Sequence, residues 1–372
     1  MSEEHVYQPE VTSETILFAR NLKMYFPVRR TFIDVLKKSP KLTLKAVDGV
    51  SFDVKYGEVF TLAGESGCGK TTTGKLVIRL HTPTEGIVGY RVSKEIAEEL
   101  GPIVEKAKVS EYGHVNIGAI PLKSYKPIRK EIQMIWQDPY GSLNPRRTIY
   151  EILEEPLAIH DIGVSKEDRY DIVAKALEAV KLTPPEDFME RYPHMLSGGQ
   201  RQRVVIARAL ILNPKFLVAD EPVSMLDVSI RAEILQLMME LKNKLGLTYL
   251  FITHDLAVAR YISNRLAIMY LGKIVELGDA RRVIENPYHP YTKALIEAIP
   301  EADPTRRLSI REIPIKGEVP SPINVPPGCR FHPRCVALDE HPEIRDLCTK
   351  KEPPLIEVEK GHYVACWLYA RR

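Results

Sequence analysis

One stretch of the sequence has the residue types and the spacing of a phosphate-binding loop: Gly64, Glu65, Ser66, Gly67, Cys68, Gly69, Lys70, Thr71 and Thr72. Its glycines allow successive backbone N–H groups to turn inward and contact phosphate oxygens at the start of a helix. In such a loop Lys70 contacts the β- and γ-phosphates of a nucleotide, and the Thr71 hydroxyl binds Mg²⁺. The alternative is a glycine-rich turn without a ligand, which does not require Lys and Thr at these offsets. We therefore predict a site for a nucleoside triphosphate with Mg²⁺.

Two adjacent carboxylates, Asp220 and Glu221, end the apolar run that begins at Phe216. Neighbouring residues on a strand point to opposite sides, so the two acids cannot do the same job. Asp220 suits indirect binding of Mg²⁺. Glu221 then points toward the γ-phosphate, where it can polarise a water molecule for in-line attack. The alternative is a solvated strand end without chemistry.

Two more polar side chains follow apolar runs: Gln137 comes after residues 132–136, and His254 comes after residues 248–252. In open α/β sheets, ligands bind at the carboxyl ends of the strands. We predict that the Gln137 amide contacts Mg²⁺ or the attacking water. We also predict that His254 donates a hydrogen bond to the γ-phosphate. Taken alone, a strand-end glutamine is usually a loop residue and a lone histidine is usually structural, but the neighbouring motifs favour catalytic roles.

A second candidate anion site lies at the start of a strongly helical run, 201–212. It is made by Ser197, Gly198, Gly199 and Gln200, which follow Leu196. Serine and glycine are typical of the position that caps a helix N-terminus. Unpaired N–H groups, a hydroxyl and the positive end of the helix dipole favour an anion there. The alternative is an ordinary helix cap.

An aromatic ring upstream of the phosphate loop could stack on an adenine base. Tyr25 is the candidate, and its alternative role is plain packing.

The elements that must position these residues alternate between strand and helix patterns. Apolar runs at 59–63, 132–136, 216–219 and 248–252 read as buried strands, and 42–54 alternates like an antiparallel edge strand. We predict an α/β fold: a P-loop NTPase core with an antiparallel β-subdomain, a helical subdomain and a small cysteine-containing extension. The predicted boundaries are a flexible tail (1–15), a nucleotide-binding domain (16–285) with a surface insertion (87–121) and a helical subdomain (141–212), and a C-terminal extension (286–372).

The composition excludes several classes of protein. The chain has 372 residues, 44% hydrophobic and 27% charged, which is ordinary for a globular protein. A net charge of +3 is too small to argue for a nucleic-acid partner. No apolar run approaches the ~20 residues of a membrane span. The polar stretch Met1–Glu10 is not expected to be a signal or transit peptide, and Cys68 within the phosphate loop suits a reducing cytoplasm.

The other four cysteines, Cys329, Cys335, Cys348 and Cys366, lie in a Pro- and Gly-rich region with little apolar content to form a core. Such a segment needs a covalent or metal cross-link. Disulfides are disfavoured in a cytoplasm. Structural zinc usually uses tighter paired spacing, whereas an iron–sulfur cluster with four thiolates accepts irregular spacing. All three chemistries stay open on the residues alone.

In its order of motifs the chain resembles the nucleotide-binding subunit of ATP-binding-cassette (ABC) transporters. The resemblance extends from Leu17 onward and implies hydrolysis of ATP to ADP and phosphate. It implies that two such subunits, either two copies or this chain with a homologous partner, pair head to tail. Each ATP then lies between the Lys70 loop of one subunit and Ser197–Gly199 of the other.

The C-terminal part resembles the ATPase subunits of the oligopeptide/dipeptide importer family, and residues 258–262 and 270–272 look closer to the second (F-type) of the two subunits. The resemblance is carried by residues 285–292, 317–322 and 328–335. It implies two transmembrane permease subunits, an extracytoplasmic solute-binding protein, a peripheral location on the cytoplasmic face of the membrane, and a [4Fe–4S] cluster on the four cysteines. Met225 and the long segment 87–121 depart from the family pattern.

Two other functions are compatible with the same machinery. One is import of oligosaccharides, because solute selectivity belongs to the partner proteins. The other is a soluble ABC ATPase without a transport role, which usually has two cassettes or long coiled coils. This chain has one cassette and no sustained heptads.

Overall fold

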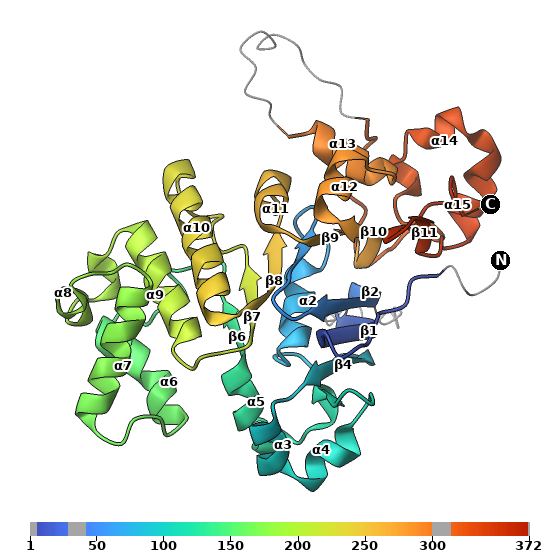
Figure 1. Ribbon diagram of the computed structural model, residues 1–372. Helices are drawn as coiled ribbons and strands as arrows, with labels where there is room; N and C mark the ends of the chain where they lie inside the picture. The colour runs from blue at the N-terminus through green and yellow to red at the C-terminus, as the bar shows by residue number, and fades with distance from the viewer. Residues whose placement is uncertain (1–5, 29–41, 300–313, 371–372) are drawn as a thin grey trace, which may run out of the picture.

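The computed structural model describes residues 6–28, 42–299 and 314–370. Within these ranges the strands form a larger sheet of eight strands and a smaller one of four. Figure 1 shows a group of helices on one side of the molecule and the C-terminal segment on the other, with strands between them. Across the described residues, none of the helices combines the length and the apolar character that a membrane crossing requires.

The larger sheet carries the predicted strand-end residues. Its strands are β3 (Val59–Ala63), β6 (Ile132–Ile135), β7 (Phe216–Asp220), β8 (Thr248–Thr253), β9 (Arg265–Tyr270), β10 (Lys273–Asp279), β11 (Ile356–Glu359) and β12 (His362–Val364). They follow the order β11-β12-β10-β9-β3-β8-β7-β6. The five strands β9, β3, β8, β7 and β6 are parallel to one another, so their carboxyl ends lie at one edge of the sheet. The α/β fold predicted from the sequence is therefore present.

Strand β7 separates two hydrophobic cores. Phe216 and Val218 pack into the core shared with the smaller sheet, whereas Leu217 and Ala219 pack into the core shared with the helical part. This alternation follows from the two-residue period of a strand. All five residues of β7 are buried, as is typical of parallel strands covered on both faces. The strand-end carboxylates are thus held by a rigid central element.

The smaller sheet is antiparallel and has the order β2-β1-β4-β5. Its strands are β1 (Thr15–Pro27), β2 (Thr43–Lys55), β4 (Glu85–Arg91) and β5 (His114–Asn116). The sequence predicted an edge strand at 42–54, which corresponds to β2. It also predicted a surface insertion over 87–121, and this differs from the structure: β4 pairs with β1, and β5 pairs with β4. Backbone pairing across distant segments makes the ends of this region part of the β-subdomain.

The helical part comes between β6 and β7. It comprises α6 (Ile149–Ile159), α7 (Lys166–Ala179), α8 (Pro185–Met189), η4 (Pro193–Met195) and α9 (Gly198–Leu210). Helices α6, α7 and α9 each begin with a capping box, in which a Ser or Thr hydroxyl and the side chain three residues later exchange hydrogen bonds with the backbone. Their buried faces, including Leu153, Leu177 and Val204, form a common core.

The remaining helices up to residue 297 flank the two sheets. They are α2 (Lys70–Val77), α3 (Lys94–Leu100), α4 (Pro102–Ala107), η2 (Ile117–Ala119), η3 (Leu122–Ser124), α5 (Lys126–Glu131), α10 (Val228–Leu245), α11 (Leu256–Ile262), α12 (Ala280–Glu285) and α13 (Pro290–Glu297). Helix α10 ends at Gly246, whose φ of +65° is the left-handed conformation that suits a glycine after a helix.

The C-terminal extension joins the cassette through the larger sheet. Strands β11 and β12 form a hairpin, and β12 pairs with β10. The extension also contains η6 (His332–Arg334), α14 (Ala337–Glu340), η7 (Pro342–Ile344) and α15 (Arg345–Lys350). Its own core is small and centres on Leu338, Ile344 and Cys348. This limited core matches the low apolar content noted in the sequence.

The N-terminal segment differs from the flexible tail predicted for residues 1–15. Residues 1–5 lie outside the described part of the chain, but the residues that follow are packed. The Tyr7 side chain is buried and its hydroxyl donates a hydrogen bond to Asp53 at 2.7 Å. The Tyr7 N–H donates to the Leu355 carbonyl at 2.8 Å. Contacts with both the smaller sheet and the C-terminal extension order this segment, and local composition does not reveal them.

Candidate functional site

The phosphate loop connects β3 to α2, as its strand–loop–helix context predicted. Gly64 and Gly69 have φ values of +146° and +105°. A Cβ at Gly64 would lie 2.2 Å from the Met269 carbonyl oxygen, and one at Gly69 would lie 2.2 Å from the Ala46 carbonyl oxygen. Both positions therefore require glycine. Helix α2 begins without a side-chain cap, so its first N–H groups are available to an anion.

Lys70 lies inside the loop and is 4% exposed. Its ammonium donates hydrogen bonds to the carbonyl oxygens of Gly64 at 2.7 Å and Glu65 at 2.9 Å. Hydrogen bonds between charged groups are stronger than those to neutral carbonyls. The ammonium is therefore placed to exchange these carbonyls for phosphate oxygens.

Thr71 connects the loop to the end of β7. Its hydroxyl donates to a carboxylate oxygen of Asp220 at 2.8 Å. Burial raises the pKa of Asp220 and the charge of Glu221 adds to this effect, while the Thr71 hydrogen bond opposes it. A cation beside a carboxylate favours its ionised form. A hydroxyl paired with a buried carboxylate is thus a donor set that fits Mg²⁺.

Three strand ends converge on the carboxylate of Glu221, which is 12% exposed. One of its oxygens accepts hydrogen bonds from the Gln137 amide at 3.1 Å and from His254 Nδ1 at 3.0 Å. The Glu221 backbone has φ +45°, and its N–H donates to the Ile252 carbonyl at 2.9 Å. The ends of β6, β7 and β8 together orient a single carboxylate beside the phosphate loop.

These groups line one cavity of about 750 Å³. Its lining includes most of the phosphate loop and the three strand-end side chains: Gly64, Glu65, Ser66, Gly67, Gly69, Lys70, Thr71, Thr72, Gln137, Glu221 and His254. Five further lining residues were not predicted from the sequence: Phe26, Leu44, Ala46, Leu295 and Pro322. The last two belong to helix α13 and the C-terminal extension. The cavity is therefore built from distant parts of the chain.

Some predicted residues lie outside this lining. Cys68 is 3% exposed beneath the loop, where its carbonyl accepts from the Gly272 N–H at 2.8 Å. Asp220 is buried, and it contacts the cavity lining through the hydrogen bond that it accepts from the Thr71 hydroxyl. The Ser197–Gln200 stretch, which the structure describes in full, is likewise not part of the lining.

The predicted aromatic residue also differs from the one in the cavity. The Tyr25 hydroxyl donates to a carboxylate oxygen of Asp48 at 2.5 Å, and the lining contains Phe26 instead. Successive strand residues face opposite sides, so only one of these two rings can face the cavity. The adjacent aromatic in the sequence was a possible signal, but the strand register decided between them.

We expect Phe26→Ala to weaken ATP binding by about 5-fold, because base–aromatic stacking contributes ~1 kcal/mol or more. Tyr25→Ala should change ATP affinity less, since its ring lies outside the cavity lining. Calorimetric titration of the full chain with ATP measures both. A larger loss of ATP affinity in Tyr25→Ala than in Phe26→Ala would instead assign the stacking role to Tyr25.

The second predicted anion site is the N-terminus of α9. The Ser197 hydroxyl accepts from the Gln200 N–H at 3.3 Å, and the Gln200 side chain accepts from the Ser197 N–H at 3.1 Å. Ser197 is exposed, so this helix end is accessible from outside the molecule. The N-terminus of α9 does not line the phosphate cavity of its own chain.

The four C-terminal cysteines gather in one small unit. The Cys329 N–H donates to the Cys348 carbonyl at 2.8 Å. Burial raises the pKa of Cys366, and the proximity of Cys329, Cys335 and Cys348 adds to this effect. Burial raises the pKa of Cys329 to about 12. All five cysteines lie in the described residues, and none is in a disulfide. Over the same residues, no set of three or more His, Cys, Asp or Glu side chains is arranged to hold a single metal ion.

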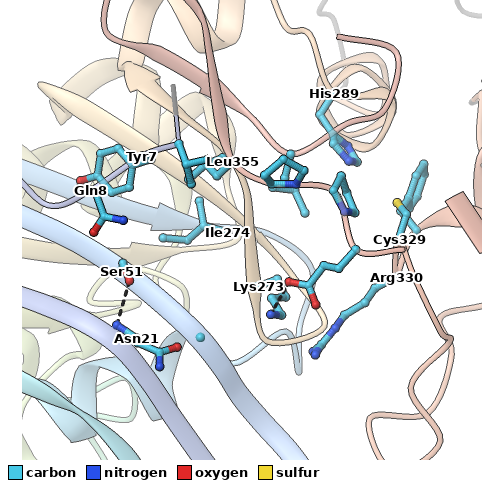
Figure 2. A pocket seen from close by; sticks show the side chains of 18 of the residues that line it. Tyr7, Gln8, Asn21, Ser51, Lys273, Ile274, His289, Cys329, Arg330 and Leu355 are labelled. Carbon is cyan, nitrogen blue, oxygen red and sulfur yellow. Dashed lines mark hydrogen bonds and ion pairs between the residues drawn. The ribbon is translucent and has the colours of Figure 1, made fainter. Parts of the chain in front are cut away.

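A second cavity, of about 350 Å³, lies where the N-terminal segment, the smaller sheet and the C-terminal extension meet (Figure 2). Lys273 forms an ion pair with Glu352 at 2.5 Å across it. Arg330, at its edge, donates hydrogen bonds to Asp48 and to the Leu271 carbonyl. Its lining includes Cys329 and no predicted nucleotide-site residue. The side chains around this cavity anchor the extension on the cassette.

Two family models match this chain. The model described as "ABC transporter" matches residues 47–224, and the model described as "Oligopeptide/dipeptide transporter, C-terminal region" matches residues 275–341. The first match includes the phosphate loop, the cap of α9 and the end of β7. The second includes the segment with Cys329 and Cys335.

Similar proteins cover nearly the whole chain. The oligopeptide transport ATP-binding protein AppF of Bacillus subtilis (strain 168) is 44% identical over 357 residues, which cover 96% of this chain and 98% of that protein. The dipeptide transport ATP-binding protein DppF of Haemophilus influenzae is 42% identical over 359 residues, with 96% and 98% covered.

Solved structures show the same fold. The dimeric ATP-binding cassette MJ0796 bound to ADP and Pi matches with a TM-score of 0.56 and 27% identity. The match covers 71% of this chain and 99% of that one. The α/β cassette predicted from the sequence is thus confirmed.

Proposed function

Because this chain belongs to the ABC transporter family, among the ATP-binding proteins of oligopeptide and dipeptide transporters, we propose that it hydrolyses ATP to power the import of short peptides. The observation that carries the proposal is the similarity to AppF and DppF along nearly the full length of all three chains. Similarity of this extent includes the cassette and also the C-terminal region, which matches the model described as "Oligopeptide/dipeptide transporter, C-terminal region".

In the proposed reaction, water attacks the γ-phosphate of ATP. The products ADP and phosphate are then released. Glu221 takes the proton of the attacking water, while Lys70 and His254 stabilise the charge on the phosphate. Mg²⁺, when bound, would neutralise charge on the phosphate oxygens. The residues that arrange this ion are Thr71, Gln137 and Asp220, and the paired hydroxyl and buried carboxylate support that assignment.

We propose that each ATP is bound between two subunits, with Ser197, Gly198 and Gly199 of one facing the phosphate loop of the other. The exposed cap of α9 and its absence from the cavity lining of its own chain support this arrangement. The similar cassette MJ0796 has been solved as a dimer. Closure of the pair completes the site, and product release opens it, which couples hydrolysis to movement. The second subunit is a copy of this chain or a homologue.

The other proposed partners are two transmembrane permease subunits and an extracytoplasmic solute-binding protein. In such an assembly this chain is peripheral on the cytoplasmic face of the membrane. Its relatives AppF and DppF are transport ATP-binding proteins, which supports this assignment.

Reconstitution tests the transport proposal. The chain is purified with its permease partners, placed in liposomes, and supplied with labelled dipeptides, oligopeptides or oligosaccharides. ATP-dependent uptake of peptides is expected, and Lys70→Ala in the same assembly is the control. Uptake of sugars alone, or ATP hydrolysis without association with any permease, would contradict peptide import.

We further propose that Cys329, Cys335, Cys348 and Cys366 hold a [4Fe–4S] cluster. The gathering of four largely buried thiols in a unit with a small core supports it, although no ready-made set for one metal ion is present among the described residues. Zinc is the alternative occupant. We expect about four iron and four sulfide ions per chain after anaerobic purification. Cys366→Ser should lower both, whereas Cys68→Ser should leave them unchanged, and bound zinc without sulfide would refute the cluster.

A further inference from the structure

One residue of the phosphate loop, Glu65, is held by the C-terminal part of the chain. Its carboxylate accepts two hydrogen bonds from the Arg334 guanidinium, at 2.9 and 3.3 Å. Its backbone N–H donates to the Tyr291 hydroxyl at 2.9 Å. Its carbonyl oxygen accepts from Lys70 at 2.9 Å. Every polar group of Glu65 is thus engaged, and Arg334 and Tyr291 both lie beyond the predicted core domain that ends at residue 285.

The Arg334–Glu65 pair is partly buried. The side chain of Arg334 is 7% exposed and that of Glu65 is 29% exposed. The Arg334 guanidinium also lies 5.8 Å from the centre of the Tyr270 ring, which packs against Tyr291. Exposed ion pairs contribute little, but removal of one partner from a buried, two-pronged pair leaves the other charge uncompensated. This pair therefore differs from the surface ion pairs of the same chain.

The charge of Glu65 matters because the loop must accept a triphosphate. Glu65 lines the same cavity as Lys70 and Thr71, so an unpaired carboxylate there would repel the phosphates. Arg334 neutralises this charge and fixes the carboxylate on the side of the C-terminal extension. The Lys70 ammonium donates a hydrogen bond to the Glu65 carbonyl oxygen. The position of Glu65 therefore also affects the ammonium that contacts phosphate.

Arg334 is itself positioned by the cysteine-bearing segment. It ends η6, where its N–H donates to the Phe331 carbonyl at 2.9 Å, and its carbonyl accepts from the Lys316 N–H at 3.0 Å. Cys335 follows it directly. The guanidinium is therefore carried to the phosphate loop by the extension.

We propose that Arg334 is a positioning residue of the nucleotide site, through which the C-terminal extension of a chain sets the ATP affinity of that chain's own phosphate loop. The proposal rests on ATP binding in the cavity described above. It does not depend on which solute is transported or on whether the cysteines hold a cluster.

The test is a double-mutant cycle on the full-length chain, with ATP affinity measured by calorimetric titration at constant Mg²⁺. Arg334→Met should weaken ATP binding about 5- to 20-fold, because it leaves Glu65 unpaired beside the phosphates. In the Glu65→Gln background, Arg334→Met should weaken ATP binding less than about twofold, because no carboxylate charge is left for Arg334 to neutralise. The KM for ATP should rise in parallel while kcat changes little.

Two controls separate this role from a loss of structure. Arg345→Met removes an exposed arginine of the same extension and should leave ATP affinity unchanged. Arg334→Lys keeps the charge without the two-pronged contact and should give an intermediate affinity. Thermal melting of each variant without nucleotide reports whether it is folded.

Unchanged affinity in folded Arg334→Met would overturn the proposal. An equal penalty in the Glu65→Gln background would also overturn it, because Arg334 would then act through another group. Should Arg334→Met fail to fold, Arg334→Lys with and without Glu65→Gln decides the question by the same comparison. Peptide uptake is not measured in this test, so failure of the transport proposal leaves its result intact.

Discussion

Glu221→Gln is expected to lower the rate of ATP hydrolysis about 10³-fold while ATP stays bound, since a general base contributes roughly 10²–10⁴-fold. The amide has nearly the shape of the carboxylate but cannot accept a proton from water. Glu221 is oriented by hydrogen bonds from Gln137 and His254 to one oxygen, and it lies in the same cavity as Lys70. We therefore expect the variant to form a stable ATP-bound pair that does not turn over.

Phosphate release and size-exclusion chromatography with ATP measure the two parts of this expectation. Glu233→Gln is the matched control, because it makes the same chemical change at an exposed carboxylate on α10 that pairs with Arg203. Its hydrolysis rate should match the parent chain. Steady hydrolysis by Glu221→Gln within about tenfold of the parent rate would exclude Glu221 as the base, since loss of that base costs more.

Ser197→Arg is expected to reduce hydrolysis more than about 100-fold and to prevent ATP-driven pairing, because the oxyanion and phosphate contacts of a site contribute on that scale. ATP affinity of the single chain should stay nearly constant. Ser197 is exposed at the start of α9 and contributes nothing to the cavity of its own chain. A bulky arginine there blocks the surface that the second subunit's ATP must meet.

The change also removes a helix cap, which by itself costs about 1 kcal/mol of stability. Ser165→Arg controls for this loss, because Ser165 is the exposed cap of α7 in the same helical part and forms the same kind of capping box. It should fold with a similar loss of stability and retain hydrolysis. A strong loss of ATP affinity in the isolated Ser197→Arg chain would indicate that Ser197 acts on its own phosphate loop.

Several elements could be predicted because their signals are local. The apolar runs that became β3, β7 and β8 are short and bounded by polar residues. Ser197 was recognisable as a helix cap from its neighbours alone. The predicted flexible tail differs from the structure at residues 6–15, which contact distant parts of the chain. The predicted surface insertion differs at β4 and β5, which pair with distant strands.

The sequence by itself determined which family the chain belongs to, and it predicted which loop binds phosphate and which carboxylate acts as a base. These depend on residue type and on offsets of a few positions, where the backbone leaves few alternatives. Only the tertiary structure decided which aromatic ring faces the cavity and that Arg334, 269 positions beyond Glu65, reaches the phosphate loop. Such contacts depend on strand register and on side-chain packing between segments far apart in the chain, and short sequence patterns contain neither.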